Sequence, residues 1–176
     1  MDELKTKSVN PWKWVPSLYF AWGGMNRDYG RDFFKKMSAW MTTVDKLRDG
    51  AFANRALAYK ALSDLKKNGS MPGVGPAYFT KLLFFLSPKH NGYIMDQWTS
   101  KSVNLLTGNR TVDINTAGIV TMANTEPNYE NFCETIDSLS ELLGVTPMEA
   151  EEKIFSKGGR NKGLWRQFVI NNWSLI

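Results

Sequence analysis

A short run rich in glycine and proline, residues 69–76, joins two segments with helical patterning and limits how they can fold together. Gly73 and Gly75 can adopt positive φ and let another backbone approach closely, and Pro76 suits the first position of a helix. Amide groups left unpaired at the start of that helix would point outward, with the positive end of the helix dipole behind them. Such a site can bind a phosphate without reading a base sequence. The alternative is an ordinary turn between two helices.

Apolar side chains recur at helical spacing along most of the chain. The segment 52–67 precedes the glycine run, and the segment 76–86 after it is apolar almost all round, so we expect it to be buried, with Lys81 as its charged exception. Further helices are predicted over 32–47, 97–106 (N-capped by Asp96), 129–143 and two C-terminal segments, the first capped by Thr146 with Glu149. Only 111–114 could form a short extended piece. The sequence therefore predicts a mainly α fold, a compact helical bundle with little or no β-structure.

Length and composition favour one folded domain. A chain of 176 residues can bury a core, and 43% hydrophobic with 22% charged residues excludes a disordered chain. No apolar run approaches the roughly 18 residues that span a bilayer, so we expect no membrane partner. The single cysteine, Cys133, excludes an internal disulfide and an iron–sulfur cluster, and it fits the reducing cytoplasm.

The charge balance fits a polyanionic partner. The formal net charge is +5 and the sequence pI is about 9.3, which raises the odds of nucleic-acid binding only modestly. Aromatic residues make up 13% of the chain, with seven tryptophans that either fill a core or stack on a base. His90 is the only histidine, and no spaced His/Cys cluster accompanies it, so we expect no metal site.

The glycine run, the apolar helix, the polar loop 87–92 and Asp96 follow one another in a specific order. This stretch, about 60–106, resembles the helix-hairpin-helix (HhH-GPD) superfamily of base-excision DNA glycosylases. It is most similar to the 8-oxoguanine DNA glycosylase branch, in particular its small bacterial members. The resemblance implies a single glycosylase domain over 1–176, with an N-terminal aromatic arm at about 8–24, the hairpin motif and catalytic loop at about 52–106, and C-terminal helices at about 127–173.

In that superfamily an aspartate after the hairpin is catalytic, and Asp96 stands at the matching position. Cleavage of an N-glycosidic bond develops positive charge on the deoxyribose, which a carboxylate stabilises, or the carboxylate activates water. An aspartate at a helix start is more often only a cap, but capping would fix the side chain, so the two roles are compatible. Contacts to the DNA backbone are expected from Gly73, Val74 and Gly75 through their amides, and from Lys101.

A lysine nucleophile is missing from its expected place. Bifunctional members of the 8-oxoguanine type carry a lysine immediately after Gly-Val-Gly-X, where it forms a Schiff base with the sugar. Here that residue is Ala77, nineteen residues before Asp96. The resemblance therefore implies a monofunctional glycosylase that leaves an abasic site. Lys81 lies one turn further along the same helical face and could substitute, which would make the enzyme a bifunctional glycosylase/lyase.

A glycosylase must hold an extruded base between aromatic or apolar faces. Trp98, Tyr78, Phe79 and Trp22 are candidates for that pocket, although each could equally be core, Phe79 above all. We therefore expect a DNA glycosylase that acts as a monomer without a cofactor. Its substrate would be an oxidised purine or another modified base, in repair or in defence against foreign DNA. A further alternative is a non-catalytic helix-hairpin-helix module that only binds DNA.

Overall fold

The computed structural model describes residues 27–87, 92–155 and 163–176. These ranges hold eight α-helices, one 3-10 helix and no β-strand, and their only β-pairing is an isolated bridge between Ile114 and Val120. The helices are α2 (Arg27–Lys35), α3 (Met37–Arg48), α4 (Arg55–Lys67), α5 (Pro76–Leu86), α6 (Gln97–Thr107), α7 (Glu126–Leu143), α8 (Pro147–Phe155), α9 (Leu164–Asn172) and the 3-10 helix η2 (Trp173–Leu175). The predicted mainly α fold is confirmed. None of the described helices combines the length and the apolarity needed to cross a membrane. The predicted arm at 8–24 lies outside the described residues.

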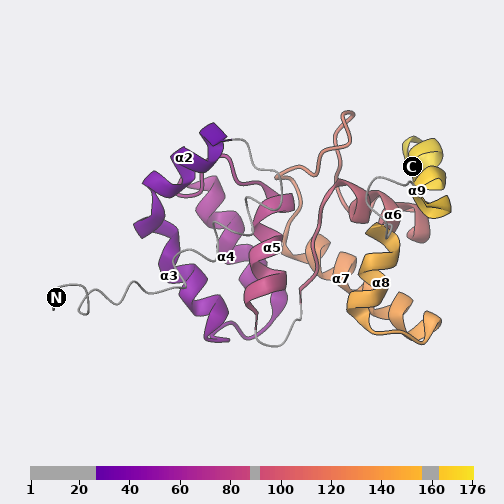
Figure 1. The fold of residues 1–176 in the computed structure, drawn as a ribbon, viewed down its shortest axis with the longest axis horizontal. Helices are drawn as coiled ribbons and strands as arrows, with labels where there is room; N and C mark the ends of the chain where they lie inside the picture. The colour runs from indigo at the N-terminus through magenta and orange to yellow at the C-terminus, as the bar shows by residue number, and fades with distance from the viewer. Residues whose placement is uncertain (1–26, 88–91, 156–162) are drawn as a thin grey trace, which may run out of the picture.

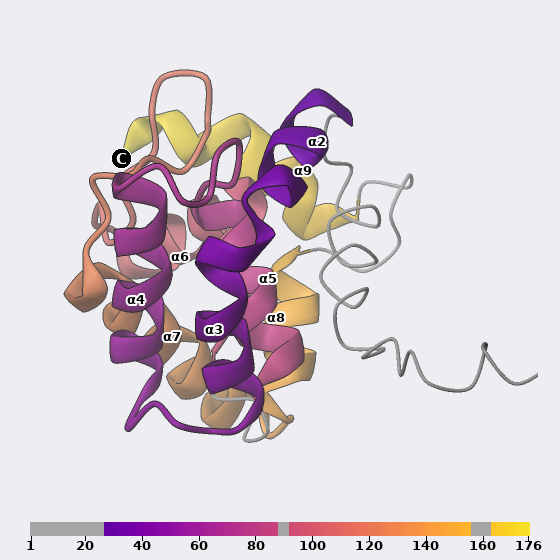
Figure 2. The same ribbon diagram turned by 90° about the vertical axis from the view of Figure 1, so that its left-hand side faces the viewer.

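The helices form two groups that α7 connects. The helices α3, α4 and α5 contact one another, and α6 contacts both α8 and α9 (Figure 1). Between them, α7 contacts α4 on one side and α6 and α8 on the other. Figure 2 shows α3 and α4 side by side in the first group. The segment between α5 and α6 passes from one group to the other and carries Asp96 at its end.

Aromatic rings join the first group to α7 in the core. Tyr59 of α4 stacks on Tyr129 of α7 at a centroid distance of 4.5 Å, and the edge-to-face partner of Tyr59 is Phe79 of α5, at 5.2 Å. All three side chains are fully buried. Such pairs add to the free energy gained from burial alone. Part of the high aromatic content therefore serves the core.

The prediction of one helix over 32–47 is wrong, because the chain bends at Lys36 and forms α2 and α3 instead. Two donors, Lys36 N and the indole Nε1 of Trp40, reach the carbonyl of Phe33, each at 3.1 Å. The Trp40 ring also stacks on the Phe33 ring at 4.2 Å. The bend thus buries both rings and still satisfies the indole N–H.

Local signals predicted the start of α5 and the cap of α8 correctly, but not the start of α4. The predicted helix 76–86 is α5, with Pro76 in its first turn. The predicted capping box before α8 is present, since Thr146 N donates to Glu149 Oε2 at 2.8 Å and Glu149 N donates to Thr146 Oγ1 at 3.3 Å. Helix α4 begins at Arg55, three residues later than predicted, because the side chain of Asn54 caps it.

Candidate active site

The connection between α4 and α5 has an open backbone at Gly75. Gly73 adopts a φ of +70°, as predicted, and a Cβ there would lie 2.6 Å from Cβ of Tyr29 in α2. Gly75 is extended instead and forms the N-cap of α5, with open space where a Cβ would stand. Gly75 N and Ala77 N donate no hydrogen bond to any described residue. These two amides at the start of α5 could therefore meet an anion.

Asp96 is the N-cap of α6, as predicted. Its Oδ1 accepts hydrogen bonds from Trp98 N at 2.7 Å and Thr99 N at 3.0 Å, and Thr99 Oγ1 accepts from Asp96 N at 3.1 Å. The hydrogen bonds that described residues make to this carboxylate all go to Oδ1. The cap therefore fixes the side chain through one oxygen and leaves the other, Oδ2, available for chemistry.

Side chains from four different helices hold the irregular segment 93–96. Each of its four amides has its own side-chain acceptor. Tyr93 N donates to Tyr129 Oη (3.0 Å, α7), Ile94 N to Glu151 Oε1 (2.6 Å, α8), Met95 N to Thr80 Oγ1 (3.1 Å, α5) and Asp96 N to Thr99 Oγ1 (3.1 Å, α6). Buried amides need such partners, and a segment without regular structure can obtain them only from side chains or water. The position of Asp96 is thus set by contacts from α5, α6, α7 and α8 together.

Thr80→Val is expected to lower the free energy of unfolding by about 1–3 kcal/mol, because valine has nearly the same shape but would leave Met95 N unpaired. The Thr80 hydroxyl also donates to Pro76 O at 2.7 Å. Urea unfolding of both proteins measures the difference. Thr135→Val is the control, since the Thr135 hydroxyl bonds only to the Asn131 carbonyl of its own helix. Equal losses in both variants would contradict a special role for Thr80.

A groove of about 800 Å³ runs between α5, α6 and α8 and contains Asp96. Its described lining is largely apolar and aromatic, with a few charged groups. The lining residues are Lys81, Phe84, Phe85, Ile94, Asp96, Gln97, Trp98, Thr99, Thr146, Met148, Glu149, Glu151, Glu152 and Phe155. An apolar cleft with a few convergent polar groups is the usual form of a small-molecule or base site. The groove also brings Lys81 and Asp96, fifteen residues apart in sequence, into one site.

Lys81 and Asp96 counter the cost of burying each other's charge. Burial lowers the pKa of Lys81, which is 9% exposed, and the charge of Asp96 opposes that change. Burial raises the pKa of Asp96, whereas the amides of Thr99 and Trp98 and the charge of Lys81 lower it. The charge of Asp96 also acts on Lys101 and Arg166, whose pKa values burial lowers. Three cations therefore favour the ionised form of Asp96.

Glu151 is the buried acid of the groove that the sequence did not reveal. The residue is 5% exposed, and burial raises its pKa to about 8, with the Ile94 amide lowering the pKa and Asp96 raising it. Glu151 stands in an acidic run that resembles a solvated helix face. Its spacing of three residues from the buried Ile154 is the one signal that it could face inward.

The predicted pocket residue Trp98 lines the groove, half-buried, with one guanidinium and one ammonium against its ring. The Cζ atom of Arg166 lies 4.0 Å from the ring centroid, and Nζ of Lys101 lies 4.7 Å from it. Lys101, expected at a DNA phosphate, is instead buried. Its Nζ also lies 4.1 Å from the ring centroid of Trp173, and a Cβ on Gly118 would lie 2.4 Å from the same Nζ. The charge of Lys101 thus faces rings rather than an open surface.

Of the other predicted pocket residues, Tyr78 and Phe79 are not part of the described lining of the groove. Tyr78 is half-buried, with Nζ of Lys81 5.0 Å from its ring centroid. Phe79 is fully buried against Tyr59 in the core, so we leave it out of the base pocket. Trp22 and His90 lie outside the described residues. Among the described residues, no group of three or more His, Cys, Asp or Glu side chains could hold a metal ion.

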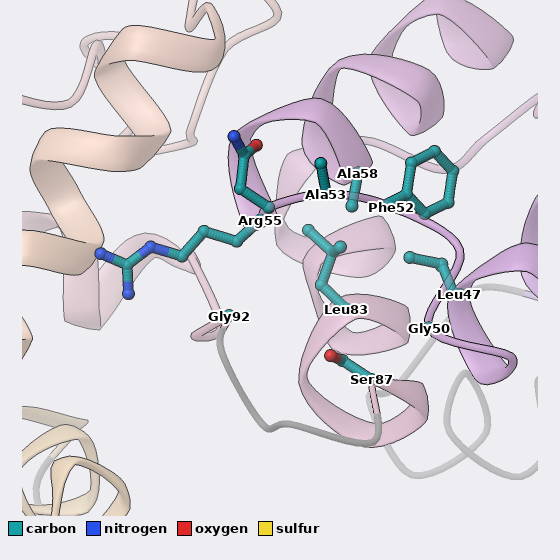
Figure 3. A pocket seen from close by; sticks show the side chains of 10 residues that line it. Leu47, Gly50, Phe52, Ala53, Arg55, Ala58, Leu83, Ser87 and Gly92 are labelled. Atoms are coloured by element: carbon teal, nitrogen blue, oxygen red, sulfur yellow. The ribbon is translucent and has the colours of Figure 1, made fainter.

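A second cavity, of about 40 Å³, is too small to compete with the groove (Figure 3). Leu47, Ala58 and Leu83 are among its lining residues, and it has room for no more than a few water molecules. Arg55 lines it with its stem, but Figure 3 shows the guanidinium pointing away toward α7. There it pairs with Glu130 and Asp137, each at 2.8 Å. The groove at Asp96 is therefore the candidate active site.

One comparison with known proteins gives a family. A family model described as "Putative 8-oxoguanine DNA glycosylase OGG-like protein" matches residues 13–155. Comparison with curated proteins and comparison with solved structures gave no match. The matched range contains Lys81, Asp96 and Glu151 and ends where α8 ends, so α9 with Arg166 lies beyond it. Because the match covers most of the chain, this protein belongs to the OGG-like protein family that this model describes.

Proposed function

We propose that this protein extrudes a modified base from DNA and hydrolyses its N-glycosidic bond, leaving an abasic site. The observation that carries the proposal is the geometry of Asp96: a carboxylate fixed through one oxygen, open at the other, in a groove with aromatic walls. The family supports the same reaction class, since its members are described as DNA glycosylases. The substrate would be an oxidised purine or another modified base, in repair or in defence against foreign DNA.

Asp96 would act on the sugar while the groove holds the base. As the bond to the base breaks, positive charge develops on the deoxyribose, and the Asp96 carboxylate stabilises it. Water then adds to C1′, and its proton passes to the carboxylate. Trp98, on the groove wall, would hold the extruded base by stacking. The charges of Arg166 and Lys101 against its ring would keep the Trp98 side chain in place.

The start of α5 would bind the DNA backbone. The amides of Gly75 and Ala77 lack described partners, and the open space at Gly75 would let a phosphate approach closely. The Val74 amide, predicted to bind the DNA backbone, already donates to Met71 O at 3.4 Å, so Val74 would instead shape the turn through its fully buried side chain. Gly73 would shape the turn through its positive φ. Contacts of this kind would set the register of the DNA and leave base selection to the groove.

The glycosylase reaction is tested by incubating the protein with duplexes that each carry one modified base, followed by alkali. Strand cleavage that requires alkali, at one or more modified bases and not in unmodified DNA, is the expected result. That pattern would identify the substrate and show that the product is an abasic site. Binding of all duplexes without release of any base would favour the alternative, a DNA-binding module without catalysis.

Lys81 supports a second candidate function, a glycosylase/lyase. Its ammonium lies in the groove with Asp96, and burial lowers its pKa, which increases the share of the nucleophilic free amine. We nevertheless propose the monofunctional reaction, because Ala77 occupies the usual nucleophile position.

Borohydride is expected to trap no covalent complex with the wild-type protein under conditions in which base release is complete. The reason is that only a Schiff base between an amine and the sugar is reduced to a stable adduct. Gel mobility measures the trapped fraction. A trapped complex that Lys81→Ala abolishes and Lys60→Ala preserves would instead establish the lyase, because Lys60 is an exposed lysine of α4.

A further inference from the structure

Two carboxyl groups of the groove are fixed by the same short segment, 93–96. Asp96 ends the segment 93–96, and Glu151 binds the amide of Ile94 within it. Both side chains line the groove. Hydrolases that cleave glycosidic bonds commonly use two carboxyl groups. One is protonated and donates its proton to the leaving group, and the other is ionised and acts at the sugar.

Glu151 is held in the same manner as Asp96. One oxygen, Oε1, accepts from Ile94 N at 2.6 Å, and no described residue bonds to Oε2. The residue is 5% exposed and is directed from α8 into the groove. A buried carboxyl group with one fixed oxygen and one unpaired oxygen can present a proton on the unpaired one.

The surroundings of the two carboxyl groups favour different protonation states. Asp96 accepts two amide hydrogen bonds and has Lys81, Lys101 and Arg166 around it. Glu151 accepts one amide hydrogen bond and has Asp96 as its charged neighbour. The other titratable groups near it are Tyr129 of α7, Lys81 of α5 across the groove, and Glu149 and Glu152 of its own helix. Glu151 is therefore the group that keeps its proton near neutral pH, in agreement with its pKa of about 8.

We propose that Glu151 is the general acid of the reaction, donating its proton to the departing base while Asp96 stabilises the sugar. This inference rests on the proposed glycosylase function. The proton moves from Oε2 to a ring nitrogen or carbonyl oxygen of the base, and the electron pair of the C1′–N bond leaves with that base. Water adds to C1′ and gives its proton to Asp96, and Glu151 regains a proton from solvent.

The role of Glu151 also defines a class of substrate. A neutral base is a poor leaving group as an anion and leaves more readily when an acceptor atom is protonated. A base that already carries a positive charge needs no such donor. We therefore infer that the groove is built for neutral modified bases with an acceptor atom that can meet Glu151.

Glu151→Gln is the decisive variant, because glutamine keeps an oxygen for Ile94 N but has no acidic proton. We expect the single-turnover rate of base release to fall about 10²–10⁴-fold. The wild-type rate should fall about tenfold for each pH unit above roughly 8, as Glu151 ionises, whereas the variant should lack that alkaline decline. Glu134→Gln, at an exposed position of α7, should behave as the wild type does.

Three outcomes would overturn the role. A Glu151→Gln rate close to the wild-type rate, with a slow Glu151→Ala, would show that only the hydrogen bond to Ile94 matters. Carboxyl ¹³C signals of labelled glutamate test protonation without any substrate: a signal that titrates near pH 8 and is absent from Glu151→Gln is expected. Titration of Glu151 in the ordinary glutamate range would contradict the inference. Absence of base release by the wild type from every duplex would overturn the proposed function itself, and this role with it.

Discussion

Asp96→Asn is expected to lower the single-turnover rate of base release about 10²–10⁴-fold while the fold stays intact. Asparagine is as good an N-cap as aspartate, so the hydrogen bonds to Trp98 N and Thr99 N can be kept. What the substitution removes is the negative charge beside the developing positive charge of the sugar. If Asp96 were only a capping residue, Asp96→Asn would leave both the stability and the rate of base release unchanged.

Rapid-quench measurement of base release and thermal unfolding of the same samples make the comparison. Asp64→Asn serves as the control, because Asp64 is an exposed residue that pairs with Lys60 on the surface of α4. In the wild type, the rate should also fall as the pH drops through the pKa of Asp96, since the ionised form is the active one. Burial raises that pKa, so this acidic decline should lie above the range of an exposed aspartate. Equal rates for Asp96→Asn and Asp64→Asn would remove Asp96 from the reaction.

Phe79→Ala is expected to lower the free energy of unfolding by about 3–5 kcal/mol. Phe79 is fully buried, and its ring packs edge-to-face on Tyr59 at 5.2 Å, so the truncation opens a cavity where α4 and α5 meet. Urea unfolding measures the loss. Phe168→Ala is the matched control, because Phe168 of α9 is 49% exposed and should lose far less. A Phe79→Ala protein that stays stable but no longer releases the base would instead show that Phe79 belongs to the base pocket.

Local sequence signals were enough for the helix that carries Asp96 and for the helix before it. Pro76 marks the first turn of α5. Asp96 caps α6, because its side chain accepts hydrogen bonds from the amides two and three residues further along the chain. Interactions of this range are encoded in neighbouring residues, so they can be recognised without knowledge of the fold. The capping box of Thr146 and Glu149 was predictable for the same reason.

Contacts between distant segments were not predictable. Nothing in the sequence links Glu151 to Ile94, or Thr80 to Met95, because each pair meets only when several helices have packed. The burial of Lys101 likewise depends on remote residues, the ring of Trp173 and the turn at Gly118. The bend at Lys36 follows from the packing of two rings and overrides a continuous helical pattern.

The most direct measurement of the central claim is the affinity of the protein for two abasic duplexes that differ only in the charge of the sugar analogue. One duplex carries a cationic pyrrolidine in place of the deoxyribose, and the other carries a neutral tetrahydrofuran. Because a glycosylase binds the developing positive charge best, the wild type should prefer the cationic duplex by about 10²-fold or more, and Asp96→Asn should lose most of that preference. Equal affinity of the wild type for the two duplexes would contradict a catalytic role for the Asp96 groove.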